Sequence, residues 1–390
     1  MEDSFSCDSK KRFIVLKTLQ ENENILFLTS LISPYKNSVF LKYFNDVNWE
    51  EVVAIANKYY LIPLVYKSLK RYKLYETLQD KQLQEYLKEI YLLNKKRNEK
   101  ILLQVKEIAT ILKEISVTPI FFKGSAALLE NHYETLGERV MTDIDFYVEP
   151  NKINDVIDLL KNHGYQEIEE DKILEENWHH YRPMYKEGSI APIEVHRYFL
   201  SERSRKYFFG TSEIQHKEMK SFQNVAVLQP SYELYLSFLH SELSHRNHQY
   251  KSLALRHLQH AAVILHKYQN EIDLEKLALH SEGKLLQNVW YDYVRIQKYY
   301  FMVDIVGIKE STKHLRDIEE KLQKEKNVML YIKMFFRVLK TAYSLRVLQV
   351  KYNFRGRMLY LYFVLKHSFY LVNKYAIQKN DSLRRLLEKK

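Results

Sequence analysis

Apolar positions in residues 1–115 recur at helical spacing. They predict a helix from Trp49 to Tyr60, a break at Pro63 and a second helix over Leu64–Leu69. A longer helix is predicted from Lys81 to about residue 115, with charged side chains that are typical of a solvated face rather than of a nucleic-acid site. Its apolar stripe consists of Leu83, Tyr86, Leu87, Ile90, Leu93, Ile101, Val105, Ile108 and Leu112.

Residues 116–215 change to short β-type segments that alternate with shorter helical ones. The expected strands are Thr118–Phe122, Thr142–Val148, Tyr165–Glu169, Trp178–Tyr185 and Pro192–Arg197, and the expected helices are Ala126–Asn131 and Ile153–Asn162. This order predicts a small mixed sheet with helices on one side. Because such a sheet is too small to stand alone, the flanking helices are expected to clamp it.

The pattern is helical again from about residue 220 to the end of the chain. The expected helices are Pro230–His240, Leu253–Tyr268, Leu274–Leu279, Gln287–Val303, Thr312–Glu325 and Val328–Val350. The predicted fold class is therefore α+β and predominantly helical. It consists of an N-terminal helical region (1–115), a mixed-sheet core (116–215) and a C-terminal helical domain with a basic, aromatic tail (216–390).

Lysine and arginine alternate with tyrosine and phenylalanine between residues 328 and 374, and almost no acid occurs before Asp381. Such a segment is typical of a surface that contacts RNA or an acidic membrane. An amphipathic pair of core helices explains the pattern equally well, because lysine and arginine stems pack on apolar surface while their charges stay in water.

Composition narrows the class of protein. The 31 Tyr and 19 Phe against 8 Gly and 7 Pro favour long helices over a sandwich or barrel. The net charge of +11 suits an anionic partner such as a nucleotide, nucleic acid or acidic lipid, and suits a solvated surface as well. The lone Cys7 excludes an internal disulfide and a cysteine-based zinc cluster, which favours a reducing compartment.

The ends and the apolar runs of the chain predict a cytoplasmic protein. The first ten residues contain acids and no apolar signal-peptide core. The longest candidate run, Met358–Leu365, is closed by Arg357 and Lys366, well short of the roughly 18 apolar residues of a membrane span.

A phosphate-binding turn is predicted at Lys123-Gly124-Ser125, between a strand and an Ala/Leu-rich helix. The N–H groups at a helix start attract anions, and Gly124 lets the backbone approach a ligand closely. Downstream, the strand period of two places Asp143 and Asp145 on the same face. Two neighbouring carboxylates repel each other unless a cation lies between them.

A third acid lies in the predicted strand Pro192–Arg197. Glu194 stands between Ile193 and Val195, so it shares a strand face with His196. Three acids and a phosphate turn are what two-metal nucleotidyl transfer requires, with Glu194 as third metal ligand and candidate general base. The alternative for Glu194 is a solvent-facing acid on an edge strand.

Together, Lys-Gly-Ser, a following arginine, Asp-Ile-Asp and Ile-Glu-Val-His resemble the DNA polymerase β-type nucleotidyltransferase superfamily, and most closely the bacterial family of uncharacterised nucleotidyltransferases. The resemblance covers about residues 45–265. It implies that Gly124 and Ser125 hold a nucleoside triphosphate and that Mg²⁺ or Mn²⁺ binds the three acids, which are Asp143, Asp145 and Glu194. It also makes Lys123 and Arg139 charge neutralisers for the leaving pyrophosphate, or partners in structural salt bridges.

The histidines give weaker signals. His196 and His180 are expected beside the metal ligands, although His179 and His180 point to opposite faces if the chain is extended there. Where an aspartate is expected in a later helix, this chain has His260. A structural zinc site is disfavoured by loose spacing and the lack of cysteine; its possible ligands are His240, His245, His257 and His260.

The sequence thus predicts an Mg²⁺-dependent nucleotidyltransferase that transfers a nucleoside monophosphate from an NTP to an acceptor and releases pyrophosphate. Small molecules, RNA and proteins all remain open as acceptors. One alternative is a metal-dependent glycosyltransferase, because Asp143 and Asp145 also suit a sugar nucleotide. The other is a non-catalytic module that keeps the fold and binds RNA, a membrane or a protein.

Overall fold

The structure is a computed structural model that describes residues 20–35, 43–168, 179–208, 216–219, 222–250, 252–274, 277 and 284–303. The chain divides into two compact units, and the second, residues 169–175 and 324–390, lies outside the described residues. The predicted helices Thr312–Glu325 and Val328–Val350 and the basic segment 328–374 also lie outside them.

The N-terminal part is helical, as predicted. Its elements are α2 (Gln20–Leu31), α3 (Trp49–Lys58), α4 (Ile62–Arg71), the short 3₁₀ turn η2 (Tyr75–Thr77) and α5 (Lys81–Lys113). The carboxylate of Asp80 caps α5 by accepting the N–H groups of Gln82 and Leu83. Pro63 lies in the first turn of α4 rather than breaking a helix, because a residue without an N–H is tolerated there.

A seven-stranded mixed sheet forms the centre of the described residues, with the strand order β3-β4-β5-β2-β1-β7-β6. The strands are β1 (Ile120–Phe121), β2 (Ile144–Tyr147), β3 (Gln166–Glu167), β4 (Met184–Tyr185), β5 (Ile193–His196), β6 (His216–Glu218) and β7 (Ala226–Leu228). The helical elements between them are α6 (Gly124–Leu129), η3 (Pro150–Lys152), α7 (Ile153–Asn162) and α8 (Glu202–Arg205).

Strands β6 and β7 were not expected, and with them the sheet continues past residue 215. β7 pairs in parallel with β1, with Ile120 opposite Ala226, and β6 closes this edge as an antiparallel partner. A three-residue apolar run just before Pro230 carries too little pattern to be told from a helix start. The three-part division of the chain stays a prediction.

The last described part is helical again. It contains α9 (Pro230–Leu239), the π-helical turn η4 (His240–Ser244), α10 (Asn247–Tyr250), α11 (Leu255–Lys267) and α13 (Lys284–Phe301). These helices match three of the predicted ones to within a few residues. None of the helices in the described ranges combines the length and apolar character that crossing a lipid bilayer requires.

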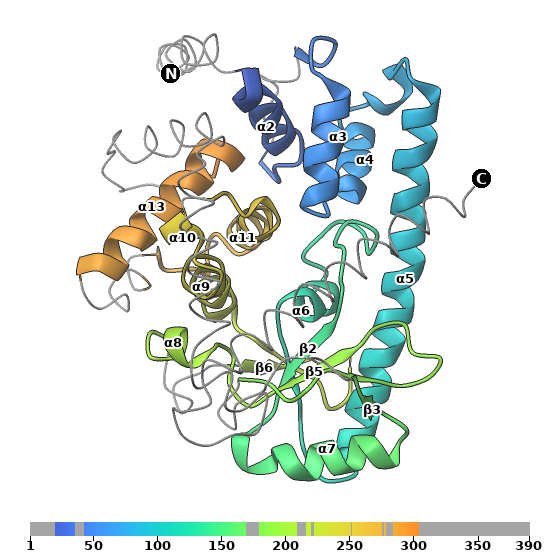
Figure 1. The fold of residues 1–390 in the computed structure, drawn as a ribbon, viewed down its shortest axis with the longest axis vertical. Helices are drawn as coiled ribbons and strands as arrows, with labels where there is room; N and C mark the ends of the chain where they lie inside the picture. Colours follow the sequence, from blue (N-terminus) through green and yellow to red (C-terminus); the bar gives the residue numbers. More distant parts are fainter. Residues whose placement is uncertain are drawn as a thin grey trace, which may run out of the picture. The chain divides into compact units, whose positions relative to one another are not determined.

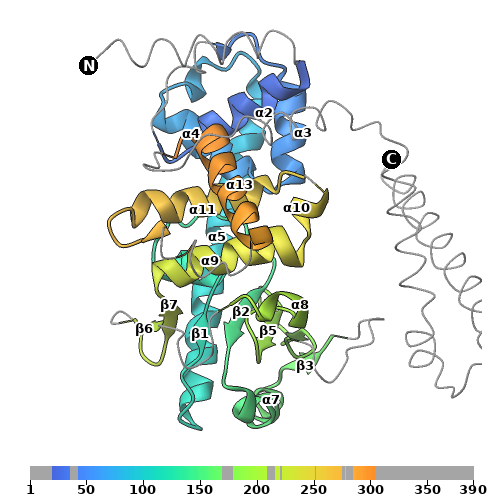
Figure 2. The same cartoon turned by 90° about the vertical axis from the view of Figure 1, so that its left-hand side faces the viewer.

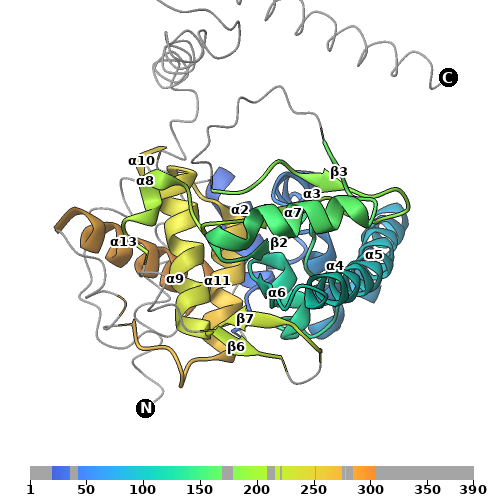
Figure 3. The same ribbon diagram turned by 90° about the horizontal axis from the view of Figure 1, so that it is seen from below.

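Helices cover both faces of the sheet: α6 and α7 lie on one face, as predicted, and helices from both flanking regions cover the other. Phe121 joins an apolar cluster with α5, α6 and α7, whereas its neighbours Ile120 and Phe122 join a second cluster with α2–α4, α9, α11 and α13. Figures 1 and 2 show α9 on one side of the strands and α7 on the other. Figure 3 shows α5, α6 and α7 gathered together, away from α13. The α+β, predominantly helical class is confirmed.

Candidate active site

Two parallel strands bring the predicted acids together. β2 pairs with β5 so that Asp145 lies opposite Glu194 and Tyr147 lies opposite His196. The ring Nε2 of His196 is 2.9 Å from Asp145 Oδ1 and 3.5 Å from Glu194 Oε2. Residues two apart on a strand share a face, so this register gathers Asp145, Glu194 and His196 at one point.

Asp143 lies one residue before β2 and is half-buried. Its carboxylate accepts a hydrogen bond from Thr142 Oγ1 at 3.1 Å. Burial raises the pKa of Asp143, and the charges of Asp145 and Glu194 raise it further. The three carboxylates therefore repel one another, and a bound cation would relieve this repulsion. Oxygen donors in such a group suit Mg²⁺ or Mn²⁺.

Lys123 forms an ion pair with the central acid. Its Nζ is 2.9 Å from Oδ1 of the buried Asp145. Burial lowers the pKa of Lys123, but the nearby carboxylates outweigh this effect and raise it. Burial in turn raises the pKa of Asp145, and Lys123 and His196 outweigh it and hold that pKa far below its usual range. Both side chains are thus charged at neutral pH.

The predicted phosphate turn is tight and buried. Lys123 has φ 55° and ψ −122°, a region that favours glycine, and its N–H donates to Glu233 Oε1 at 2.9 Å. A side chain on Gly124 would meet Met141 Cγ at 3.0 Å. Ser125 Oγ is buried and has no hydrogen-bond partner among the described residues. A buried hydroxyl without a partner is costly, which marks Ser125 as a group that a ligand can satisfy.

Two neighbouring arginines, of which Arg256 lies near Asp143, have no acidic partner in the described ranges. Within the described ranges, neither the buried Arg139 nor the half-buried Arg256 forms an ion pair. Arg256 donates from Nη2 to the carbonyl of Val140 at 2.8 Å, and its guanidinium lies over the ring of Tyr60. Burial lowers the pKa of Arg256 to about 10, and the charges of Arg139 and Asp143 also act on it. This guanidinium pair is suited to an anionic ligand.

Three histidine rings meet beside Glu194. The ring of His196 lies 5.5 Å from that of His179 and 5.2 Å from that of His180, between centroids. His180 Nε2 is also 3.9 Å from Glu194 Oε2. The expectation that only one of His179 and His180 points at the site was wrong. His180 makes an isolated antiparallel bridge to His196, which brings both rings beside β5.

His260, which stands where an aspartate was expected, is buried on α11. Its Nδ1 is 3.3 Å from the hydroxyl of Tyr133, and its Nε2 is 3.7 Å from Glu233 Oε1. Because burial lowers the pKa of His260 well below its usual value, the ring is neutral. Its Nε2 has no hydrogen-bond partner among the described residues, and it lies beside the carboxyl group that holds the Lys123 turn.

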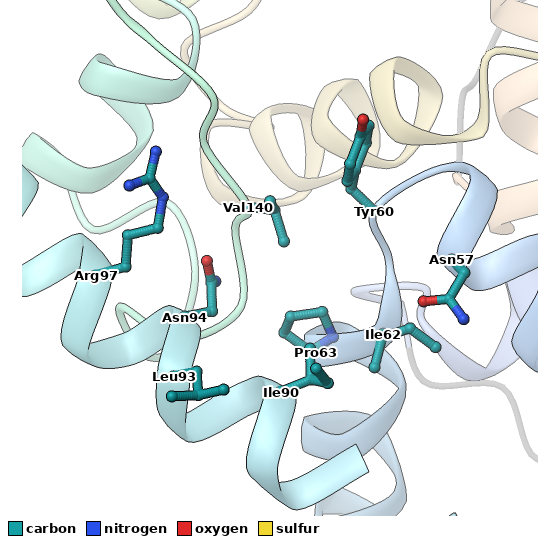
Figure 4. A pocket seen from close by; sticks show the side chains of 9 residues that line it. All are labelled: Asn57, Tyr60, Ile62, Pro63, Ile90, Leu93, Asn94, Arg97 and Val140. Atoms are coloured by element: carbon teal, nitrogen blue, oxygen red, sulfur yellow. The ribbon is translucent and has the colours of Figure 1, made fainter. Parts of the chain in front are cut away.

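A small cavity of about 260 Å³ lies between α5 and the chain around Val140 (Figure 4). Two of its polar side chains, Asn94 and Arg97, already donate to main-chain carbonyls. Asn94 donates to the carbonyls of Gly137 and Arg139, and Arg97 donates to the carbonyl of Met141. The cavity therefore belongs to the support of the loop that leads to Asp143, and the acids lie outside its lining.

Sequence reasoning missed Arg256, Glu233 and the contact of His179. Arg256 lies in the stretch Leu255–His260, where an aspartate was expected. The sequence pattern does not show that Arg256 lies near Asp143. Glu233 gives no signal, because its role depends on a hydrogen bond to a residue 110 positions earlier in the chain.

An α+β fold that carries three acids on and beside adjacent strands, next to a Gly-Ser turn, defines a protein of the nucleotidyltransferase class. The chain belongs to the family described as uncharacterised nucleotidyltransferase, whose model matches residues 45–297. No curated protein and no solved structure matches it. Membership identifies a transferase of the general nucleotidyltransferase type.

Proposed function

We propose that the protein transfers a nucleoside monophosphate from an NTP to an acceptor, with Mg²⁺ or Mn²⁺ held by Asp143, Asp145 and Glu194. The observation that carries this proposal is the convergence of the three carboxylates, which the raised pKa of Asp143 reflects. Divalent ions bound there supply positive charge that activates the acceptor hydroxyl and neutralises the leaving pyrophosphate.

Glu194 is the best-placed general base. Burial raises its pKa, but the hydrogen bond to His196 and the charges of His180 and His196 outweigh this effect, so the pKa of Glu194 is lowered. The carboxylate is therefore ionised at neutral pH and can accept the proton of an acceptor hydroxyl. His196 contacts both Asp145 and Glu194 and so fixes the distance between the two strands' acids.

The triphosphate has four groups to bind it. The Gly124-Ser125 turn offers main-chain N–H groups and the unpartnered Ser125 hydroxyl. Arg139 and Arg256 offer guanidinium groups without an acidic partner in the described ranges, and such groups bind phosphate in a bidentate manner. Lys123 can exchange its contact with Asp145 for a phosphate oxygen when a metal ion neutralises that acid.

The test is nucleotide labelling with the full chain. The purified protein is incubated with Mg²⁺, each α-labelled NTP in turn and total cell extract, and the label is sorted into RNA, protein and small-molecule fractions. We expect label in one fraction and a loss of about 10²-fold or more in Glu194→Gln and Asp143→Asn. Glu114→Gln, which changes an acid paired with His163 instead, is the matched control and keeps full labelling.

Two outcomes would contradict the proposal. Unchanged labelling in Asp143→Asn would show that the carboxylates are not needed for the reaction. Turnover of sugar nucleotides, with no turnover of any NTP, would favour a glycosyltransferase. Circular dichroism of each variant separates loss of chemistry from loss of fold.

A further inference from the structure

Three histidines outside the carboxylate group come together at the end of α9. The centroids of the His240 and His245 rings are 4.4 Å apart, and the ring of His257 lies 5.4 and 5.5 Å from them. The ring nitrogens that can bind a metal all lie within 4.8 Å of one another.

A π-helical turn makes this cluster possible. In an α-helix, residues five apart are separated by about 140° around the axis, so His240 and His245 would face different ways. In η4 the N–H of His245 donates to the carbonyl of His240 at 3.0 Å, and this i→i+5 bond places both rings on one side. The Asn247 amide satisfies the carbonyl of Ser241 at 2.8 Å. Such turns are rare and occur often at functional sites.

The third ring comes from a neighbouring helix. His257 lies in the first turn of α11, which packs against α9, and Figure 2 shows α9, α10 and α11 close together. The sequence spacing alone disfavoured a metal site, since it gave no sign of the π-helical turn. The two helices and the turn together supply three ligands from one face.

The chemistry of the cluster favours a transition-metal ion over an anion. Each ring offers one nitrogen to the group, and imidazole nitrogen is a common ligand of zinc and related transition metals. Ligand nitrogens around tetrahedral zinc are separated by about 3.4 Å, because each Zn–N bond is about 2.0–2.1 Å long. His245 is exposed, so its ring is free to close the remaining distance.

We propose that His240, His245 and His257 bind one transition-metal ion of the Zn²⁺ class. Three imidazoles leave a fourth coordination position for water or a substrate atom, as in catalytic zinc sites. The three histidines lie on η4 and α11, whereas Asp145 and Glu194 lie on β2 and β5, so the two groups are separate. The proposal does not depend on nucleotidyl transfer.

The test uses Co²⁺ as a visible probe for zinc sites. The full chain is stripped with a chelator and titrated with Co²⁺ in about 10 mM Mg²⁺, because Mg²⁺ occupies oxygen ligands and competes poorly for imidazole. We expect one equivalent of Co²⁺ with the visible absorption of a tetrahedral site. His245→Ala should weaken this binding by more than about 100-fold.

Two controls assign the signal. His163→Ala removes a histidine that pairs with Glu114 instead, and it should bind Co²⁺ like the wild type. Asp145→Asn should also keep the signal, because Asp145 belongs to the other group. His257→Phe, which keeps a ring of similar size, repeats the test if His245→Ala unfolds. Equal Co²⁺ binding by the wild type, His245→Ala and His257→Phe, or no visible band in the wild type, would overturn the proposal.

Discussion

Lys123 combines a strained backbone with a buried ion pair. Its φ of 55° is a conformation that glycine adopts freely and that costs other residues about 1–3 kcal/mol. The fold tolerates this strain because Glu233 holds the N–H of Lys123 and Asp145 holds its ammonium group. Backbone strain of this kind is often found at functional sites. Here it accompanies the contact between the Lys123 ammonium group and Asp145.

Two substitutions of Lys123 measure the free-energy cost of its strained backbone. Lys123→Gly and Lys123→Ala both remove the ion pair, so only the backbone preference separates them. We expect the glycine variant to be more stable by about 1–2 kcal/mol in urea unfolding. At the exposed Lys96, in the interior of α5 where glycine is less favourable than alanine, the same two substitutions should give the opposite order. Equal stability of the two variants at residue 123 would show that its backbone is relaxed.

Glu233 should make stability depend on pH. Burial raises the pKa of Glu233 to about 8, from an ordinary value of 4.5. Between these values the folded protein holds a proton that the unfolded chain releases, so stability is highest below pH 4.5 and falls as pH rises toward 8. The slope is up to about 1.4 kcal/mol per pH unit.

The measurement compares urea unfolding of the wild type and Glu233→Gln between pH 5 and pH 8 in steps of about one unit. Glutamine keeps the carbonyl oxygen that accepts the N–H of Lys123, so the fold is retained. The free energy of unfolding of the wild type should fall relative to that of the variant as pH rises. Parallel curves would show that Glu233 titrates near its ordinary value.

Single residues show where sequence reasoning works and where it stops. Asp143, Asp145 and Glu194 were found because a strand period of two and flanking apolar residues fix their face locally. Arg256 and Glu233 were not found, because each acts on a residue more than 100 positions away along the chain. Contacts between residues so far apart in the chain depend on tertiary packing, and the spacing of apolar residues in the sequence does not predict them.

At the scale of elements, α5 supports the loop that carries Arg139. Asn98, wholly buried on this helix, donates to the carbonyls of Leu136 and Arg139 at 2.5 and 2.7 Å. Asn94, one turn earlier, donates to the carbonyls of Gly137 and Arg139. The apolar stripe predicted α5 well, but the buried amides were indistinguishable in sequence from solvated positions.

Removing one amide should loosen this loop. Asn98→Leu has a similar volume but leaves the carbonyl of Leu136 without its donor, at a cost of about 1–3 kcal/mol. We expect that loss in urea unfolding, together with a weaker apparent affinity for NTP, because Arg139 is less well held. Leu103→Ala on the same helix changes a side chain that is 63% exposed, and it should shift stability by less than about 0.5 kcal/mol. Asn98→Leu with unchanged stability would place the support of the loop elsewhere.

The strands were predicted less evenly than the helices. β2 and β5 each have alternating or apolar patterns over four residues, and both were expected. β6 and β7 have three residues each, and the exposed ends of β6 show no apolar pattern. β7 takes its place in the sheet by pairing with β1, and β6 by pairing with β7; local sequence pattern does not predict such pairing.

At the scale of the whole described fold, the N-terminal and C-terminal helices share one apolar cluster. Helices α2–α4 and α9, α11 and α13 all contribute to it, and Ser33 Oγ donates to the carbonyl of Phe301 at 2.5 Å. The sequence predicted that flanking helices clamp the sheet, but not that they join each other. The acids lie on the sheet face that looks toward this cluster, as the contact of Phe122 with His196 indicates.

A nucleotide bound at the proposed site would therefore contact the sheet and the helices together. Asp143 and Asp145 belong to the sheet, whereas Arg256 belongs to α11. A ligand that binds only the folded state stabilises it by about 2.7 kcal/mol at 100 times its Kd. We expect Mg²⁺ with an NTP analogue that resists cleavage to raise the unfolding temperature by about 5 °C or more, and Mg²⁺ alone to give a smaller rise.

Two variants divide this effect between the sheet and the helices. Asp143→Asn removes a metal ligand and should abolish both rises, since Mg²⁺ binding relieves the repulsion among the carboxylates. Arg256→Met removes the guanidinium that α11 offers to the triphosphate and leaves the carboxylates in place, so it should keep the rise with Mg²⁺ alone and lose most of the further rise with the analogue. Arg182→Met is the matched control, because Arg182 pairs with Glu167 away from the acids. A full response to the analogue in Arg256→Met would mean that the triphosphate is held by the sheet and its Gly-Ser turn without α11.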